Sequence, residues 1–170
     1  MKEMILKTKR LLLRELKQDD FDDICKLLQD PIVMYAYEGA FSKKEVQEWL
    51  DKQLRRYQND GFGLWGMIEK GSGELIGQCG LTYQEFNGQQ VPEIGYLLRA
   101  EYWHKGYATE AAIACKEYAF NILNFTSILH HTGHKYPLSK SSTKKRYEGN
   151  RKFHKTLSQY RYASFSILRG

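Results

Sequence analysis

The sequence predicts a mixed α/β fold of the α+β type, in which helices flank a twisted and mostly antiparallel central sheet. Two observations carry this prediction. Expected elements follow one another in the order β-α-α-β-β-β-α, and two hairpin turns join successive strands in the middle of the chain. At 170 residues the chain is long enough to bury a core, and we expect a single domain over residues 1–170.

The first strand is expected at residues 11–13, which are three consecutive leucines. Apolar residues then recur at helical spacing between residues 21 and 28, so this segment predicts an amphipathic helix. Asp19 or Asp20 is expected to cap its start, because a short acidic side chain can accept a bond from a free helical N–H group. Pro31 ends the helix, since the residue before proline disfavours helical geometry.

A second helix is expected to begin after Ser42. Ser42 and Glu45 have the spacing of a capping box, in which each side chain accepts a bond from the other residue's backbone N–H. Apolar residues between 46 and 54 form the inner face of this helix. It should end near Asn59, where Asn-Asp-Gly favours a turn.

Three strands are expected next. Residues 64–68 form the first, and the glycine-containing turn at residues 70–73 leads into its partner at residues 74–83. An Asn-Gly pair at residues 87–88 predicts a second hairpin turn. It leads into the third strand, at residues 91–98.

The segment Trp103 to Ala111, with the sequence WHKGYATEA, joins that strand to a helix expected over residues 109–122. The first N–H groups of a helix have no partner within the helix, and the helix dipole adds partial positive charge there. Gly106 has no Cβ and lets the backbone approach a ligand. This arrangement favours an anionic cofactor. The glycine fingerprints of dinucleotide-binding and P-loop proteins are absent.

The run YWHKGYATEA resembles the acetyl-CoA pyrophosphate loop of the GNAT acetyltransferase superfamily, and is most similar to its RimJ/RimL-type branch. The superfamily pattern is Arg/Gln-x-x-Gly-x-Gly/Ala, and Trp103, Gly106 and Ala108 stand at its three positions. An aromatic residue at the first position is common in this branch. The segments KTKRLLLRELKQDD, ELIGQCGL and EIGYLL extend the resemblance over residues 4–125, and it implies the GNAT fold.

The resemblance implies an N-acetyltransferase that moves an acetyl group from acetyl-CoA to a primary amine. That amine would be a protein N-terminus, such as that of a ribosomal protein, or a small molecule. It also implies that the cofactor's pantetheine arm pairs with the strand edge at Tyr96, Leu97 and Leu98, with Arg99 just beyond. The residues implied for the pyrophosphate, through their backbone N–H groups, are His104, Lys105, Gly106, Tyr107, Ala108 and Thr109. Lys105 could add charge at the phosphates or lie in solvent.

Acyl transfer to an amine needs a neutral nucleophile, so a general base assists it. Glu93, at the start of the cofactor strand, is our candidate for that base, acting through a water. The alternative is a strand glutamate without a catalytic role. Glu85 and Tyr83 are weaker candidates. The general acid would fall within residues 126–170, where no tyrosine can be assigned that role.

The acceptor site is expected between the first two helices and the strand ends. Tyr35, Tyr37, Glu38, Phe41 and Trp65 are the candidate lining residues, and Glu38 would suit a cationic amine. Aromatic residues at such spacing are also typical of a core, so both interpretations stay open for them.

Cys25, Cys79 and Cys115 are widely spaced and form no CxxC or zinc pattern. We expect buried, reduced thiols and no metal. No apolar run is long enough to span a bilayer and no secretory leader is evident, so we expect a cytoplasmic protein. It should be a monomer or homodimer whose partner is a small-molecule or peptide amine rather than a membrane or nucleic acid.

Residues 126–170 differ from the rest in charge. Residues 1–125 hold 16 basic and 19 acidic residues, whereas residues 126–170 hold 10 basic and 1 acidic. A GNAT chain should continue with a strand, a helix and a closing hairpin, but nothing like that is visible here, and residues 130–135 and 139–146 have no apolar period. We therefore expect neither strand nor helix after about residue 125.

Three hypotheses account for this segment. It could be a basic tail that binds nucleic acid, or a metal site built on His130, His131 and His134. It could also be a shift of reading frame, because one permitted set of codons, read one base later from about Thr126, begins VYSIIRDTNIPSQKVAQKNGM. That string supplies the strand, the Asn-x-x-Ser helix opening and the Asn-Gly turn that the superfamily has there. We favour the frame shift.

Two functions compete with the enzyme hypothesis. One is a catalytically silent domain that binds acyl-CoA. The other is nucleic-acid binding driven by the basic segment, which should depend strongly on salt.

Overall fold

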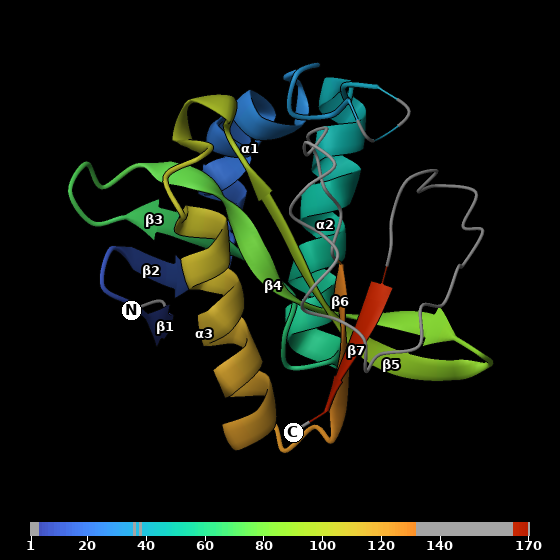
Figure 1. Cartoon of the computed structure of the whole chain (residues 1–170). Coiled ribbons are helices and arrows are strands. Elements are labelled where there is room, and N and C mark those ends of the chain that lie inside the picture. The colour runs from blue at the N-terminus through green and yellow to red at the C-terminus, as the bar shows by residue number, and fades with distance from the viewer. Residues whose placement is uncertain (1–3, 36, 38, 132–164, 170) are drawn as a thin grey trace, which may run out of the picture.

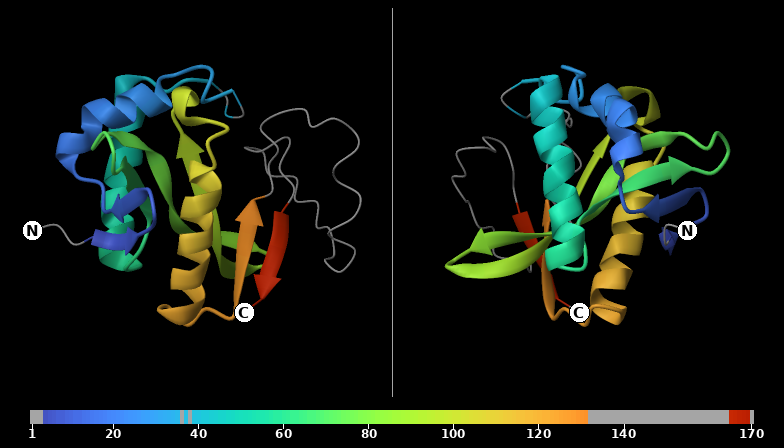
Figure 2. Two further views of the ribbon diagram at one scale, coloured as in Figure 1. Left: turned by 60° about the vertical axis from the view of Figure 1, so that its left-hand side comes forward. Right: turned by 180° about the vertical axis from the view of Figure 1, so that it is seen from behind.

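A computed structural model describes residues 4–35, 37, 39–131 and 165–169. They form one seven-stranded sheet in the order β1-β2-β3-β4-β5-β6-β7. Neighbouring strands are antiparallel except β5 and β6, which are parallel, so the expected mixed and mostly antiparallel sheet is confirmed. Helix α3 covers one face and helices α1 and α2 cover the other (Figures 1 and 2).

The N-terminal hairpin consists of β1, Met4–Lys7, and β2, Leu11–Arg14. Strand β2 matches the strand expected from the three leucines. Strand β1 was not expected, because its four residues are only partly buried. It depends on pairing with β2 rather than on an apolar pattern of its own.

Both predicted helices of the N-terminal half are confirmed. A 3₁₀ turn at Gln18–Asp20 leads into α1, Phe21–Leu28, and Asp20 is the N-cap residue by position. Its side chain makes no cap hydrogen bond to α1 and instead accepts from Arg14 and from the Lys17 N–H. Helix α2, Lys43–Asn59, opens on the expected capping box. In it, the backbone N–H of Ser42 donates to Glu45 Oε2 at 2.7 Å, and the backbone N–H of Glu45 donates to Ser42 Oγ at 3.3 Å.

Two hairpins build the centre of the sheet. Strands β3, Leu64–Glu69, and β4, Leu75–Phe86, are followed by β5, Gln89–Leu98. Asn87 and Gly88 between β4 and β5 have φ of 51° and 76°. Two left-handed residues are what a tight hairpin turn requires, so the Asn-Gly prediction is confirmed.

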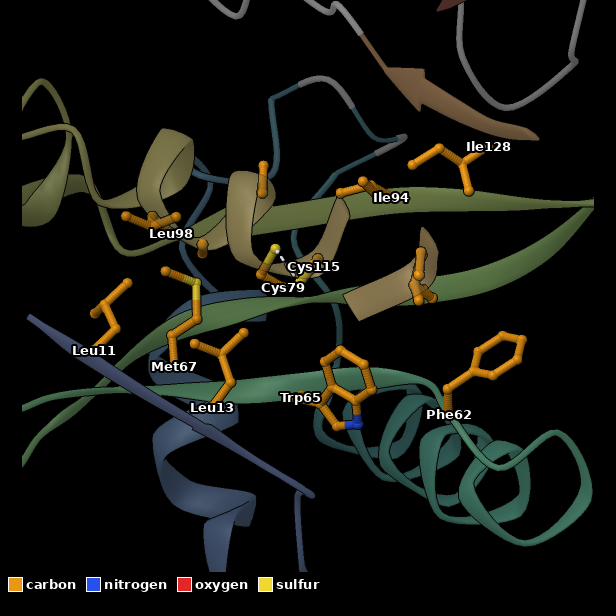
Figure 3. Packing of buried hydrophobic residues seen from close by; sticks show 14 of the residues in the cluster. Leu11, Leu13, Phe62, Trp65, Met67, Cys79, Ile94, Leu98, Cys115 and Ile128 are labelled. Atoms are coloured by element: carbon orange, nitrogen blue, oxygen red, sulfur yellow. Dashed lines mark hydrogen bonds between the residues drawn. The ribbon is translucent and has the colours of Figure 1, made fainter. Parts of the chain in front are cut away.

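Helix α3, Tyr107–Asn121, begins two residues earlier than expected, because Gly106 at φ 79° serves as its N-cap. Its buried residues Ala111, Cys115 and Ala119 pack on the sheet. Figure 3 shows the side chains that meet there. The cluster between α3 and the sheet includes Leu11, Leu13, Phe62, Trp65, Met67, Ile76, Cys79, Leu81, Ile94, Leu98 and Ile128.

A second cluster lies on the opposite face of the sheet, under α1 and α2. It consists of Leu16, Ile24, Leu27, Leu28, Val33, Met34, Val46, Leu50, Leu75 and Leu97. The sheet is therefore buried on both faces. Leu97 and Leu98 end β5 with one leucine in each cluster, as alternation along a strand requires.

The expectation of no strand after about residue 125 was wrong for two segments. Strand β6, Ser127–His131, lies beside β5, and β7, Phe165–Arg169, pairs antiparallel with β6. Burial of two apolar side chains stabilises β6, since Ile128 and Leu129 are only 0% and 2% exposed. A count of charges over residues 126–170 does not reveal so short an apolar segment. Residues 132–164, and with them His134, lie outside the described residues, as do the side chains of His130 and His131.

The three cysteines differ in burial. Cys79 and Cys115 are buried as expected, whereas Cys25 on α1 is half-buried. In the part of the chain that the structure describes, no helix has the length and apolar character needed to cross a bilayer.

Candidate functional site

The outer edge of β5 is open along its last residues. Strand β6 pairs with β5 only where Glu93 faces Leu129 and Ile94 faces His130. In the described ladders no strand pairs with Gly95 to Leu98 on that side, while the other side of β5 pairs with β4 along its whole length. The two neighbours of β5 therefore diverge and leave backbone groups unpaired.

The direction of those groups follows from one hydrogen bond. The backbone N–H of Arg99 donates to the carbonyl of Ile76 at 2.9 Å, so Arg99 faces β4. Because backbone groups alternate in direction along an antiparallel strand, Leu98 and Tyr96 face the open edge. The Leu98 carbonyl accepts from Trp103 Nε1 at 2.9 Å. Among the described residues, no strand pairs with the N–H and carbonyl of Tyr96 or with the N–H of Leu98, so these groups could pair with an extended ligand.

The N-terminus of α3 has the backbone geometry of an anion-binding site. His104 and Gly106 both have left-handed backbones, with φ of 61° and 79°. The first bond of the helix runs from the Glu110 N–H to the Gly106 carbonyl at 3.0 Å. Gly106 offers no side-chain cap, so the preceding N–H groups of the first turn have no partner within the helix. Such groups, with the helix dipole, favour a phosphate.

The open edge and the helix start are joined by residues 99–106. A ligand that combines an extended amide arm with an anionic end fits both parts at once, because amides pair with strand edges and anions with helix N-termini. Pantetheine joined to a pyrophosphate has this chemistry. The structure thus brings together the predicted positions on β5 and those in the loop.

Two predicted cofactor residues have other contacts. The Arg99 guanidinium lies 3.6 Å from the Glu74 carboxylate and also contacts Glu101. Lys105 is exposed, and its Nζ lies 5.3 Å from the centroid of the Tyr102 ring. Each of the two cations is therefore at least partly engaged by the protein.

Tyr96 presents its side chain to the α3 face of the sheet, opposite Cys79 in the register with β4. Burial raises the pKa of the Tyr96 phenol above its ordinary value. The phenol is therefore protonated at neutral pH and remains a hydrogen-bond donor beside the open edge.

The candidate base Glu93 is half-buried on β5, between Thr82 of β4 and Leu129 of β6. It shares its strand face with Leu97, because the two are four residues apart. Leu97 packs in the cluster under α1 and α2. Glu93 thus lies on the face opposite α3, at the point where the edge of β5 opens.

The weaker candidates Glu85 and Tyr83 lie farther along the β4–β5 hairpin. Glu85 is exposed and opposite Gln90. The Tyr83 ring packs edge-on against Phe62, with centroids 5.1 Å apart. Neither lies at the opening between β5 and β6.

The predicted acceptor residues are not brought together as one surface. Tyr35 is 52% exposed, while Tyr37 and Phe41 pack against the cluster under α1 and α2. Trp65 is 1% exposed and packs edge-on against Tyr118 of α3 at 5.5 Å. This location favours the core interpretation for Trp65. Glu38 lies outside the described residues.

Sequence inspection missed a network that reaches the helix start from the N-terminal hairpin. Glu110 Oε1 accepts from Thr8 Oγ1 at 2.6 Å and Oε2 accepts from Arg10 Nε at 2.7 Å. An acidic residue in the first turn of a helix was the one available signal at Glu110. No sequence pattern near Glu110 indicates its contact with the N-terminal hairpin, which lies about a hundred positions earlier.

Comparison with known proteins gives consistent results. A family model for an acetyltransferase (GNAT) domain matches residues 10–145. The chain is 40% identical over 121 residues, 71% of its length and 70% of the relative's, to uncharacterized protein YkkB of Bacillus subtilis (strain 168). It is 32% identical over 127 residues, 74% of its length and 71% of the relative's, to the uncharacterized N-acetyltransferase YnaD of the same organism.

The fold has solved counterparts. The crystal structure of an acetyltransferase from Agrobacterium tumefaciens str. C58 superposes with a TM-score of 0.74, covering 97% of this chain and 94% of that one. At 23% identity this likeness concerns the fold alone.

Proposed function

Because the chain belongs to the acetyltransferase (GNAT) family, we propose that it is an N-acetyltransferase that moves an acetyl group from acetyl-CoA to a primary amine. The observation that carries the proposal is the open edge of β5 next to the N-terminus of α3. This pair of features has the chemistry of an amide arm ending in a pyrophosphate. Residues 103–108 connect the open end of β5 to the first turn of α3, which supports assigning the pyrophosphate to this loop.

In the reaction, the amine nitrogen attacks the thioester carbonyl, the new N–C bond forms, the C–S bond breaks and CoA leaves as a thiol. The nitrogen loses a proton and the departing sulfur gains one. Most of the rate acceleration would come from holding two reactants in place, worth on the order of 7–11 kcal/mol. The open N–H groups of Tyr96 and Leu98 are suited to hold the acyl end of the cofactor.

Glu93 is proposed as the general base, through a water. Its place at the opening between β5 and β6, on the face opposite α3, supports this role. A carboxylate there would draw the proton from an amine that approaches from the side of α1 and α2. General-base assistance of this kind contributes about 10²–10⁴-fold to rate.

The acceptor is proposed to bind near the loop between α1 and α2. Tyr35 is exposed there, and Glu38 would attract a cationic amine. The Trp103-x-x-Gly106-x-Ala108 pattern supports the RimJ/RimL-type branch, whose acceptors would be a protein N-terminus or a small amine. A panel of both kinds is therefore the appropriate substrate test.

The cofactor site can be tested by titrating the protein with acetyl-CoA and comparing two glycine variants. Gly106→Leu should lower affinity at least about tenfold, because a Cβ at residue 106 would meet Arg10 Nη2 at 3.5 Å and the larger side chain would displace the contacts that shape the helix start. Gly61→Leu is the matched control. Gly61 has φ 75°, close to the 79° of Gly106, and a Cβ there meets nothing within 4 Å. It carries the same left-handed strain, about 1–2 kcal/mol, away from the site.

Unchanged affinity in Gly106→Leu would remove the pyrophosphate-loop assignment. A loss of affinity in both variants would attribute the effect to backbone strain. Release of free CoA thiol with a panel of amines then tests the activity. Binding without thiol release for any amine would favour the catalytically silent domain, and neither binding nor release would refute the enzyme proposal.

We also propose that a complete domain is encoded by the gene, with residues 126–170 shifted in frame. The matches to YkkB and YnaD cover 121 and 127 residues and leave about three tenths of either chain unmatched, whereas the family model extends to residue 145. Some 45 residues out of frame in a chain of 170 would leave about that share unaligned.

A further inference from the structure

The loop that precedes α3 has an unfavourable backbone conformation. Within three residues it contains two left-handed backbones, His104 at φ 61° and Gly106 at φ 79°. A non-glycine residue in that region is strained and persists only when its surroundings impose it. The residues from His104 to Gly106 are exposed. Contacts from outside the loop therefore help to fix this conformation.

Arg10 binds the chain on both sides of Gly106, in the loop before it and in the first turn of α3 after it. Its Nη1 donates to the Lys105 carbonyl at 2.8 Å, before the glycine. Its Nε donates to Glu110 Oε2 at 2.7 Å, after the glycine. The guanidinium also lies over the Tyr107 ring, 4.3 Å from its centroid. The Arg10 guanidinium thus contacts the Lys105 carbonyl, the Tyr107 ring and the Glu110 carboxylate.

Glu110 completes the connection from the helix side. Besides the Arg10 guanidinium, its carboxylate accepts from the Arg10 backbone N–H at 2.8 Å and from Thr8 Oγ1 at 2.6 Å. Its side chain is 18% exposed, against 37% for Arg10. A carboxylate with three donors in a half-buried place is held in one orientation.

The turn that carries Arg10 is itself anchored. Lys70, in the turn between β3 and β4, donates its backbone N–H to the Arg10 carbonyl at 2.9 Å. Its Nζ donates to the Thr8 carbonyl and lies 3.3 Å from the Lys9 carbonyl. The N-terminal hairpin is thereby fixed to the sheet on one side and presents Arg10 to the loop on the other.

From these contacts we infer that Arg10, oriented by Glu110 and Thr8, is the positioning residue of the pyrophosphate loop. It holds the backbone of residues 105–107 in the form that binds the cofactor's phosphates. The inference rests on the proposed function and adds a residue from outside the loop. Arg10 acts through the loop, so it is not itself a catalytic residue.

The test compares two acyl donors, acetyl-CoA and S-acetylpantetheine, which lacks the pyrophosphate. Arg10→Gln should lower kcat/KM for acetyl-CoA about 10- to 100-fold and leave kcat/KM for S-acetylpantetheine within about twofold of wild type. The selectivity arises because only acetyl-CoA uses the loop. A loss of folded protein would instead lower both values equally.

Arg14→Gln is the matched control. Arg14 lies on the same hairpin and also forms an ion pair, with Asp20 at 2.7 and 2.8 Å, but it points to the α1 side. It should leave the ratio of the two donors unchanged. Arg10→Lys, which keeps the charge but cannot span Lys105 and Glu110 as a fork, should shift the ratio in the same direction as Arg10→Gln and supplies a second variant if the first folds poorly.

An unchanged donor ratio in both Arg10 variants would overturn the inference. So would an equal change of the ratio in Arg14→Gln. These results differ from failure of the proposed function, in which the wild-type protein itself would release no thiol from acetyl-CoA with any amine.

Discussion

The Glu110 carboxylate lies 2.7 Å from Arg10 Nε, although a hundred positions separate the two residues in the chain. This contact joins the first hairpin of the domain to the start of α3. A segment far from the cofactor strand thus shapes the phosphate site. It also makes the site sensitive to the ionisation of one carboxylate.

We predict that Glu110 makes stability depend on acid pH. Burial raises the pKa of its carboxyl, but the bonds from Thr8 and Arg10 outweigh it, and the net pKa lies below the ordinary 4.5. Because the folded-state pKa is the lower one, the stabilisation is complete above the ordinary value and is lost as the pH falls through the folded value.

Glu110→Gln should therefore cost about 1–2 kcal/mol of unfolding free energy near neutral pH, since hydrogen bonds to a charged group are lost and Arg10 is partly screened by solvent. The difference from wild type should shrink as the pH falls below about 4.5. Urea unfolding at several pH values measures it. Glu117→Gln, at an exposed position of the same helix, is the control, and a gap that stays constant down to acid pH would contradict the prediction.

A second prediction concerns the base. Glu93→Gln should lower kcat about 10²–10⁴-fold and leave the affinity for acetyl-CoA unchanged, because the side chain faces away from α3. Steady-state rates over a range of pH check this, since the loss of a base also removes the corresponding limb of the pH profile. If Glu85→Gln shows the loss instead, the base lies farther along the hairpin.

The sequence predicted the helices and the central strands of the fold, but not strands β1, β6 and β7, and it predicted only part of the site. Local signals located α2, whose capping box is formed by Ser42 and Glu45, and the Asn87-Gly88 turn, because each depends on neighbours in the chain. The loop at Gly106 was found for the same reason. The contact of Arg10 with Glu110 could not be predicted, because it is created by tertiary packing. Trp65 could not be assigned to core or surface until the face of β3 was known.

A third prediction uses two glycines that face each other across β4 and β5. Gly80 and Gly95 are register partners, but a Cβ on Gly80 would lie 2.0 Å from the Gly63 carbonyl oxygen, whereas one on Gly95 would meet only Leu64 Cδ2 at 3.5 Å. Gly80→Ala should destabilise the fold by about 1–3 kcal/mol, because the backbone at Gly63 must move to make room for the new Cβ.

Gly95→Ala should change the unfolding free energy by less than about 1 kcal/mol, within the spread of strand preferences. Thermal or urea unfolding of the two variants compares them directly. Equal stabilities would mean that the close approach of β4 to Gly63 is not a constraint of the fold.

A fourth prediction concerns thiol reactivity. Cys79 and Cys115 are buried, with their Sγ atoms 3.6 Å apart (Figure 3). The hydrogen bond with Cys79, together with burial, raises the pKa of the Cys115 thiol well above its ordinary value. Burial also raises the pKa of the Cys25 thiol, but Cys25 is only half-buried, whereas the other two cysteines are buried. Because a thiol must be accessible to react, an aromatic disulfide reagent should modify Cys25 alone in the native chain and all three cysteines after unfolding. Cys25→Ser should abolish the native reaction, and rapid modification of a second thiol would contradict the burial of the pair.

The last prediction concerns the frame of residues 126–170. Resequencing the gene from the Phe125 codon onward should show bases that encode the string beginning VYSIIRDTNIPSQKVAQKNGM in the neighbouring frame; any other sequence there ends the hypothesis. Two chains identical up to Phe125 can then be compared, one with the printed segment and one with the restored frame. The restored chain should unfold at a higher temperature, because its apolar residues at strand and helix spacing can bury more surface than the printed segment, in which 10 basic residues and 1 acidic residue accompany the buried Ile128 and Leu129. Acetyl-CoA should raise its unfolding temperature further, as a ligand that binds only the folded state does. Equal unfolding temperatures for the two chains would mean that residues 1–125 carry the stability of the domain alone.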